Sequence, residues 1–188
     1  RKTASGPQAP VVGSATSGSV PPMNQDTVYV SFSAEIIPAT TEVLLRTCAD
    51  LANKGTKTVH LLLSTPGGSV MHGLTIYNVL RGMPFKLITH NVGAVNSIGN
   101  VIFLSGQERY ACPNSTFMFH GVGFDVPQGV RMEEKVLRER LDSITSDQAR
   151  IGAVIGERAA FPDSAEIERL FLEAVTKDAG YAKARGII

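Results

Sequence analysis

Residues 58–69, TVHLLLSTPGGS, decide the fold of this chain. The run from Thr58 to Leu63 is almost wholly apolar, as expected of a central parallel strand that is buried on both faces. Pro66 and the glycine pair after it predict a tight turn, and apolar residues at helical spacing from Ser69 to Arg81 predict a helix. A strand, a glycine turn and a helix in this order are typical of an α/β protein with a parallel sheet.

The same alternation of strands and helices extends in both directions from this stretch. It predicts a layered parallel sheet with right-handed crossover helices. We expect one domain over residues 28–188, with a long, charged helix from Arg131 to Glu157 in its C-terminal half. Further strands are expected at 27–32, 85–91, 110–112 and 116–120, and further helices at 40–53, 97–104, 165–174 and 178–184.

The composition is that of an ordinary globular domain, with 43% hydrophobic and 19% charged residues among 188. Lys plus Arg number 18 and Asp plus Glu number 17, so the net charge of +1 argues against a nucleic-acid partner. Residues 1–27 hold no aromatic residue, and 11 of these 27 are Gly, Pro or Ser. We therefore expect a flexible low-complexity tail before the domain.

Membrane, export and metal-binding classes are also disfavoured. The uncharged segment 87–104 contains three asparagines and a histidine, which excludes a spanning helix. No apolar stretch follows the basic N-terminal residues, so no signal peptide is expected. Cys48 and Cys112 form neither a disulfide framework nor a zinc motif. We expect buried reduced thiols, a cytoplasmic location, no metal and no cofactor.

Three loops at predicted strand ends carry residues that chemistry could use. The turn at Gly67 and Gly68 can leave N–H groups bare for an oxyanion, although a plain strand-to-helix turn is the simpler interpretation. Ser97 follows a glycine-punctuated turn, as a nucleophile does, but a serine there is most often a helix N-cap. His120 ends an apolar strand, where it is either a general base or a structural histidine.

Together these parts favour acyl transfer. This chemistry needs an oxyanion pocket, a nucleophile and a base that takes its proton, and the three loops supply them in that order. The other histidines, His60, His72 and His90, have nothing beside them in the sequence that suggests a partner, so they are interpreted as structural.

Residues 28–188 resemble the Clp protease proteolytic subunit, a member of the wider ClpP/crotonase superfamily. STPGGSVMHGLTIYNVL is similar to the family's SPGG turn and following helix, GAVNSIGNVIFLSG to its catalytic-serine segment, and ACPNSTFMFHG to its catalytic-histidine segment. The resemblance implies that Ser97 is the nucleophile and His120 the base. It also implies that the N–H groups of Gly68 and Ile98 form the oxyanion hole.

The chain departs from the family pattern at the third member of the triad. In the family, a catalytic Asp lies four residues before a Ser-Ala pair that opens the last helix, and here that position is Ala174. Glu173 and Asp178 are nearby carboxylates, and either is a candidate to orient His120. Loss of the orienting acid costs orders of magnitude in rate without abolishing catalysis by a Ser-His pair.

The resemblance also implies partners. The helix Arg131–Glu157 would be a handle through which rings of subunits stack, and the substrate would be a peptide or an unfolded protein. In the family, substrate pairs as an added strand with a glycine-rich strand after the histidine, which is altered here and loses a backbone donor at Pro127. The residues before Val28 do not resemble the family's pore-lining loops, which argues against an unfoldase ATPase as partner.

The sequence therefore predicts a serine endopeptidase that hydrolyses peptides through an acyl-enzyme on Ser97, with His120 as base. Two alternatives stay open. The same fold and oxyanion cradle would suit a crotonase-like enzyme that acts on an acyl thioester. The missing acid at Ala174 would suit a catalytically weak assembly subunit.

Overall fold

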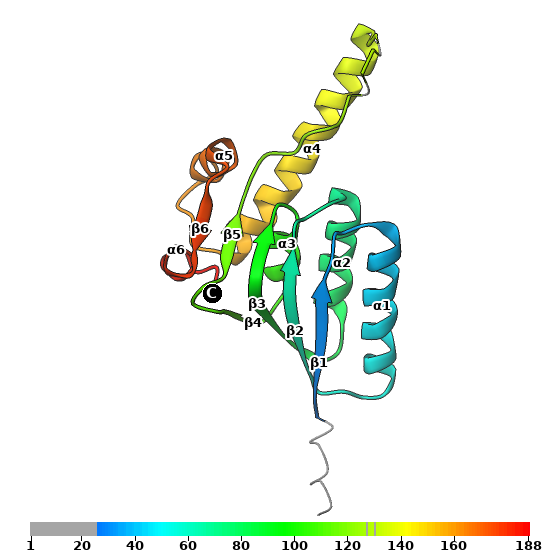
Figure 1. Ribbon diagram of the computed structural model, residues 1–188, viewed down its shortest axis with the longest axis vertical. Coiled ribbons are helices and arrows are strands. Elements are labelled where there is room, and N and C mark those ends of the chain that lie inside the picture. The colour runs from blue at the N-terminus through cyan, green and yellow to red at the C-terminus, as the bar shows by residue number, and fades with distance from the viewer. Residues whose placement is uncertain (1–25, 127, 130) are drawn as a thin grey trace, which may run out of the picture.

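The computed structural model describes residues 26–126, 128, 129 and 131–188, and it confirms the expected α/β class (Figure 1). The sheet runs in the order β1-β2-β3-β5-β6, and β4 pairs with β3 beside this path. Only the pairing of β5 with β6 is antiparallel among these strands. The flexible tail expected before Val28 falls almost wholly outside the described residues. The strands are β1 (Thr27–Ser33), β2 (Thr58–Thr65), β3 (Lys86–Asn96), β4 (Glu108–Ala111), β5 (Thr116–Met118) and β6 (Thr176–Asp178).

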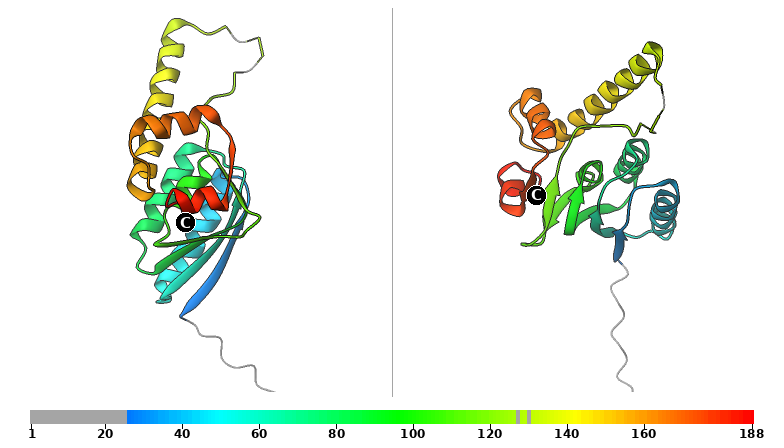
Figure 2. Two further views of the ribbon diagram at one scale, coloured as in Figure 1. Left: turned by 90° about the vertical axis from the view of Figure 1, so that its left-hand side faces the viewer. Right: turned by 45° about the horizontal axis from the view of Figure 1, so that its top comes forward.

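The first three helices alternate with the strands and lie on one side of the sheet (Figure 2). These are α1 (Pro38–Asn53), α2 (Val70–Gly82) and α3 (Gly99–Phe103). The C-terminal part adds α4 (Glu134–Arg158), α5 (Ser164–Glu173) and α6 (Ala179–Ala184). The described helices include none that is long and apolar enough to cross a membrane.

The prediction that β2 is buried on both faces is wrong. Its burial alternates, with Val59, Leu61 and Leu63 no more than 1% exposed while His60 and Leu62 are only half-buried. Side chains of a strand point alternately to the two sides of the sheet, so helices cover one face and leave the other open. The core is therefore a layer between one sheet face and the helices on it.

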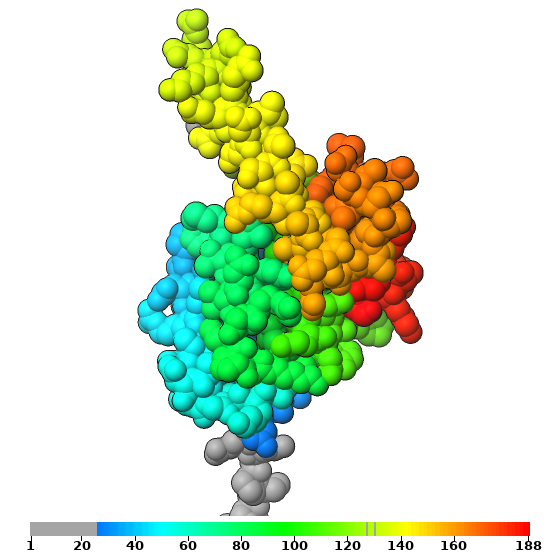
Figure 3. All heavy atoms as spheres, turned by 180° about the vertical axis from the view of Figure 1, so that it is seen from behind, coloured from blue at the N-terminus to red at the C-terminus, as the bar shows by residue number. Residues whose placement is uncertain are grey.

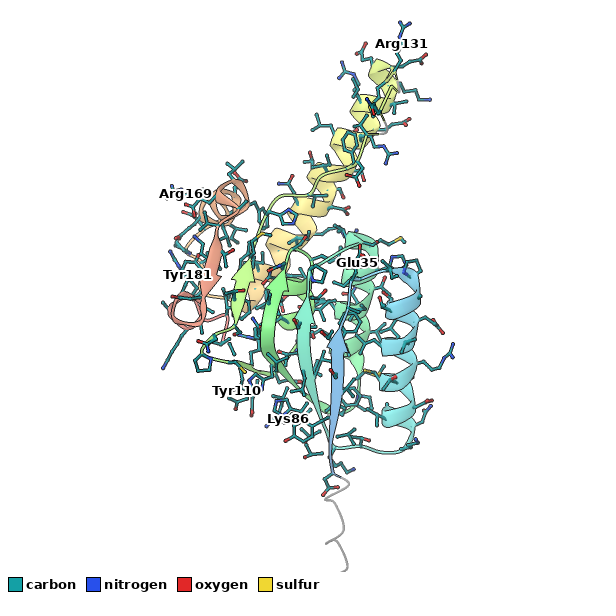
Figure 4. All side chains as sticks on the ribbon, in the orientation of Figure 1. Glu35, Lys86, Tyr110, Arg131, Arg169 and Tyr181 are labelled. Carbon is teal, nitrogen blue, oxygen red and sulfur yellow. The ribbon has the colours of Figure 1, made fainter. Side chains whose placement is uncertain are left out.

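An aromatic ladder of Tyr29, His60, His90 and Tyr110 crosses four strands on the open face of the sheet. Ring centroids lie 4.9 Å apart between Tyr29 and His60, 5.6 Å apart between His60 and His90, and 6.1 Å apart between His90 and Tyr110. His60 and His90 thus have partners that the sequence does not reveal. Burial, with a smaller effect from His90, lowers the pKa of His60, which favours its neutral form in the stack. Figure 4 labels Tyr110 at one end of this ladder.

The strand that leads to His120 differs from its prediction. β5 ends at Met118, so His120 lies in the loop beyond it, where the side chain is exposed. On its other edge β5 pairs with β6, a strand that the sequence pattern does not predict. β6 has only three residues, too few for a readable alternation of apolar and polar side chains.

The long helix expected in the C-terminal half is confirmed as α4, with 25 residues. Its N-terminal half projects beyond the rest of the domain, and Arg131 lies at the tip of this projection (Figures 3 and 4). Leu137 is 48% and Leu141 is 62% exposed there. An isolated helix is marginally stable in water, and these apolar side chains contribute little while they face solvent.

Two arginines attach the end of the chain to the sheet layer. Arg109, in β4, donates from Nε to the carbonyl of Ile187 at 2.6 Å and from Nη2 to the carbonyls of Arg158 and Gly186. Arg158 donates in turn to the carbonyls of Leu104 and Gly106. The C-terminal residues are thereby held against α3 and β4.

Both cysteines are free thiols. Cys48 is 1% exposed in the core, and burial raises its pKa to about 11. Cys112 is half-buried, with its Sγ 3.5 Å from Nε2 of His90. The predicted burial is therefore confirmed in full for Cys48 and in part for Cys112.

Candidate active site

The turn after β2 is shaped by two glycines in the left-handed half of conformational space. Gly67 has a φ of +100° and Gly68 a φ of +143°, values that other residues rarely adopt. The turn is fastened to Ile36, whose N–H donates to the Gly67 carbonyl at 2.8 Å and whose carbonyl accepts from the Ser69 N–H at 2.9 Å. A Cβ on Gly68 would lie 2.3 Å from the Ile36 oxygen, so only glycine fits there.

Ser69 is the N-cap of α2, and its side chain is a hydrogen-bond partner of His72. The Ser69 hydroxyl accepts from the N–H of His72 and lies 2.8 Å from Nδ1 of the same residue. This N-cap arrangement confirms the structural interpretation of His72.

Ser97 stands at a sharp turn between β3 and α3. Its φ is +56°, which is a strained value for a residue with a side chain. The N-cap of α3 is Ile98, and no side chain makes a cap hydrogen bond there. The alternative that Ser97 is a helix N-cap is therefore wrong. A left-handed serine between a strand and a helix is the backbone feature of a nucleophile elbow.

The two turns touch at Gly67. A Cβ built on Gly67 would lie 2.6 Å from Cβ of Ser97 and 3.3 Å from its Oγ. The missing side chain at Gly67 is therefore what allows the Ser97 hydroxyl to lie against the glycine turn.

Two N–H groups beside Ser97 are unused. Neither the Gly68 nor the Ile98 N–H donates to an acceptor among the residues that the structure describes. One belongs to the glycine turn and the other directly follows the serine in the chain. Two free backbone donors next to a serine hydroxyl have the composition of an oxyanion hole.

The imidazole ring of His120 is hydrogen-bonded to the backbone of the next residue, Gly121. Nδ1 lies 2.7 Å from the carbonyl oxygen of Gly121. A carbonyl only accepts, so Nδ1 carries the proton of the neutral ring and Nε2 keeps its lone pair. This is the tautomer that a general base needs, since the base must accept a proton at Nε2.

A cavity of about 100 Å³ collects the predicted site residues. Gly68, Ser97, Ile98 and His120 all line it, together with Asn100. The rest of its wall is largely apolar and comes from several elements: Val70, Phe119, Val122, Ile151, Ile155 and Phe171. The structure thus brings together the four residues that the resemblance singles out.

The two candidate acids are engaged elsewhere. Glu173 forms an ion pair with Lys177, with Oε2 3.0 Å from Nζ. Asp178 caps α6, where its Oδ1 accepts from the Tyr181 N–H at 2.7 Å. Neither carboxylate lines the cavity, so the geometry does not favour either as the partner of His120.

Ala174 stands at the position where the family resemblance places the acid of the triad. β5 and β6 pair antiparallel with Met118 opposite Thr176. The ladder ends at this pair, two residues before His120 on one strand and two residues after Ala174 on the other. Ala174 itself has a φ of +47°, a left-handed value that Asp and Asn tolerate better than most residues.

Asn100 is a site residue that the sequence interpretation misses. It is 1% exposed, and its side chain donates to the carbonyls of Ser97 and Met118. An asparagine three residues after the elbow serine, in an otherwise apolar helix start, is the signal that could have identified it. Its other partner, a β5 carbonyl, is a backbone group that no sequence motif marks.

The described residues offer no place for a metal. His, Cys, Asp and Glu side chains form no group of three there that could hold an ion. The chemistry available in the cavity is that of a hydroxyl, an imidazole and two backbone donors.

Comparisons with a family model and with curated proteins identify the same family. A family model described as Clp protease matches residues 25–169. The chain is 30% identical to ATP-dependent Clp protease proteolytic subunit 1 of Corynebacterium jeikeium (strain K411) over 117 residues, 54% of this chain and 62% of that protein. It is 29% identical to ATP-dependent Clp protease proteolytic subunit of Lactococcus lactis subsp. cremoris (strain SK11) over 108 residues, 52% of this chain and 54% of that protein. The chain spans about half the length of the curated relatives it matches.

The contact between the two turns can be tested by stability. Gly67→Ala should lower the free energy of unfolding by about 2–5 kcal/mol, because it adds a clash with Ser97 to the strain of a positive φ. Gly55→Ala is the matched control, with a φ of +74° and open space where the Cβ would lie. It should cost about 1–2 kcal/mol. Urea unfolding of both variants measures the difference, and equal losses would contradict the close approach.

Proposed function

The chain belongs to the Clp protease family, a family of serine peptidases, and from this premise we propose that it is an endopeptidase that cuts peptide bonds through an acyl-enzyme on Ser97. The observation that carries the proposal is the cavity in which Ser97, His120, Gly68 and Ile98 meet. Only one of these residues is a base at neutral pH, and only one is a nucleophile. Their roles follow from their chemistry.

The proposed reaction has two halves. Ser97 Oγ attacks the carbonyl carbon of the scissile bond while its proton passes to Nε2 of His120, and the N–H groups of Gly68 and Ile98 hold the oxyanion. The C–N bond then breaks, and the leaving amine takes the proton from His120. Water next attacks the acyl ester and gives a proton to His120, which returns it to Ser97 as the new carboxylic acid leaves.

Orientation of His120 is the weak point of this site. The hydrogen bond from Nδ1 to the Gly121 carbonyl supports the reactive tautomer without a carboxylate. A neutral carbonyl stabilises the imidazolium less than a charged acid does, so we expect slow turnover. The same observation favours the second candidate, a catalytically weak assembly subunit. The acyl-thioester alternative stays a prediction of the sequence, since nothing among the described residues favours it.

We propose further that copies of this chain assemble through α4. The projecting half of the helix exposes Leu137 and Leu141, and an apolar groove of about 770 Å³ lies between α4 and α5. Leu172, on the wall of that groove, is 86% exposed. A second copy of the chain would cover these surfaces, in line with the ring expected of the family. A peptide or unfolded protein is the proposed substrate, and an unfoldase partner is not part of the proposal.

A fluorophosphonate probe tests the nucleophile. The probe should add to Ser97, because an activated serine beside an oxyanion hole attacks phosphorus, and intact mass spectrometry measures the adduct. Ser97→Ala and His120→Ala should lose the adduct, whereas Ser31→Ala, at an exposed serine of β1, should keep it. Absence of labelling on the unaltered chain, while a known serine hydrolase labels in the same tube, would sink the peptidase proposal.

Restoring the acid tests the orientation of His120. Ala174→Asp should raise kcat for a fluorogenic peptide by on the order of 100-fold or more, because a carboxylate at the position that the family resemblance gives to the triad acid would stabilise the imidazolium of His120. Ala174→Asn is the matched control, since it tolerates the left-handed backbone equally but carries no charge. The proposal predicts a gain for Asp only. A rise of the same size in both variants would show that backbone strain, not charge, limits the rate.

Light scattering tests assembly. The unaltered chain should have a mass several times the 20.0 kDa of one copy. Leu141→Glu should reduce it, because a charge cannot be buried without a partner. Lys135→Glu, at a side chain that is 84% exposed on the same helix, should leave the mass unchanged. A monomeric unaltered chain would contradict assembly without bearing on the chemistry of Ser97.

A further inference from the structure

We propose that Asn100 is a positioning residue, whose carboxamide locks the Ser97 turn to the strand that leads to His120. The inference rests on the peptidase function proposed above. Three segments meet at this side chain: the end of β3, the start of α3 and the end of β5. The reactive groups come from the first and the last of these segments.

The lock consists of hydrogen bonds around one β5 carbonyl. Nδ2 of Asn100 donates to the carbonyl of Met118 at 2.8 Å and to the carbonyl of Ser97 at 3.0 Å. The Ser97 N–H donates to the same Met118 carbonyl at 2.8 Å. Met118 lies two residues before His120 in the chain. Ser97 is therefore held at both its N–H and its carbonyl. The N–H bonds directly to β5, and the carbonyl is connected to β5 through the Asn100 side chain.

This arrangement matters because Ser97 has a strained backbone. A residue with a side chain keeps a φ of +56° only where its surroundings determine it. Without Nδ2, the Ser97 carbonyl loses one of its two donors, and the Asn100 N–H at 3.1 Å alone holds the peptide after Ser97. That peptide carries the Ile98 N–H, which is a proposed oxyanion donor. Asn100 thus acts on the nucleophile and on the oxyanion hole together.

The orientation of the amide is determined by its neighbours. A flipped Asn100 would turn Oδ1 toward two carbonyl oxygens, which only accept, so Nδ2 must face them. Oδ1 then points away, and no donor among the described residues reaches it, although the atom is buried. A buried acceptor without a partner destabilises the fold.

Asn91 provides a matched comparison. It is a fully buried asparagine on β3, and its Nδ2, like that of Asn100, donates to a β5 carbonyl, that of Thr116, at 2.8 Å. Its Oδ1 accepts from the Gly93 N–H, so both ends of its amide are used. Asn91 connects β3 to β5 and makes no hydrogen bond to Ser97. It therefore represents the structural role without the positioning role.

The experiment compares Asn100→Ala with Asn91→Ala in the full chain. Each variant is measured for its urea unfolding midpoint, its rate of fluorophosphonate labelling at Ser97, and its kcat and KM on one fluorogenic peptide. Asn100→Ala should lose at least 10-fold in labelling rate and in kcat with little change in KM, while its midpoint falls no more than that of Asn91→Ala. Asn91→Ala should label at nearly the rate of the unaltered chain.

A second variant keeps the proposal falsifiable if Asn100→Ala fails to fold. Asn100→Ser has one hydroxyl proton for two carbonyls, so its labelling rate should fall between those of Ala and Asn. A full rate in Asn100→Ser, or equal rates in the two alanine variants, would overturn the positioning role and leave the peptidase proposal intact. Failure of the unaltered chain to label would overturn both.

Discussion

The place where Gly67 lies against Ser97 is the constraint on which the site depends. The turn after β2 and the turn after β3 come so close that a single methyl group on Gly67 would collide with the serine. Because the turns belong to neighbouring parallel strands, the sheet itself brings them to one edge. The left-handed φ of Ser97 then directs its hydroxyl toward the glycine turn, where free N–H groups lie on both sides. Gly67 is required for two reasons: its own turn has a positive φ, and the neighbouring serine turn leaves no space for a side chain.

His120, the proposed base, reaches this point from a different strand. His120 follows β5, which pairs with β3 on one edge and with β6 on the other. The Met118 carbonyl, with Ser97 and Asn100 as its donors, fixes the end of β5 to the serine turn. Within the part of the chain that the structure describes, the imidazole has a single hydrogen bond, from Nδ1 to the adjacent Gly121 carbonyl. Ser97 is thus held by more hydrogen bonds than the imidazole of His120, so the proposed base is the less constrained of the two groups.

Much of this could be predicted from the sequence, for physical reasons that differ between residues. The glycine pair, Ser97 and His120 are local signals, because each stands at the end of an apolar run. The elements α1, α2 and α4 are long enough for their periodicity to be read. The open face of the sheet could not be foreseen, since three leucines in β2 resemble a strand buried on both sides. The stacking of His60 on His90, the clamp at Asn100 and the positions of Glu173 and Asp178 depend on contacts between segments that are distant in the chain.

The attachment of the C-terminal residues bears on how the protein is synthesised. Arg109 binds the carbonyl of Ile187, 78 residues later in the sequence, and β6 comes after α5 to complete the sheet beside β5. A ribosome delivers the chain from its N-terminus, so the strands that carry the serine turn emerge well before the segment that closes the other edge of β5. Until Ile187 has left the exit tunnel, the nascent chain holds Ser97 and His120 without a finished sheet around them. Assembly of the site is therefore expected to be complete only after the segment that Arg109 binds has emerged from the ribosome.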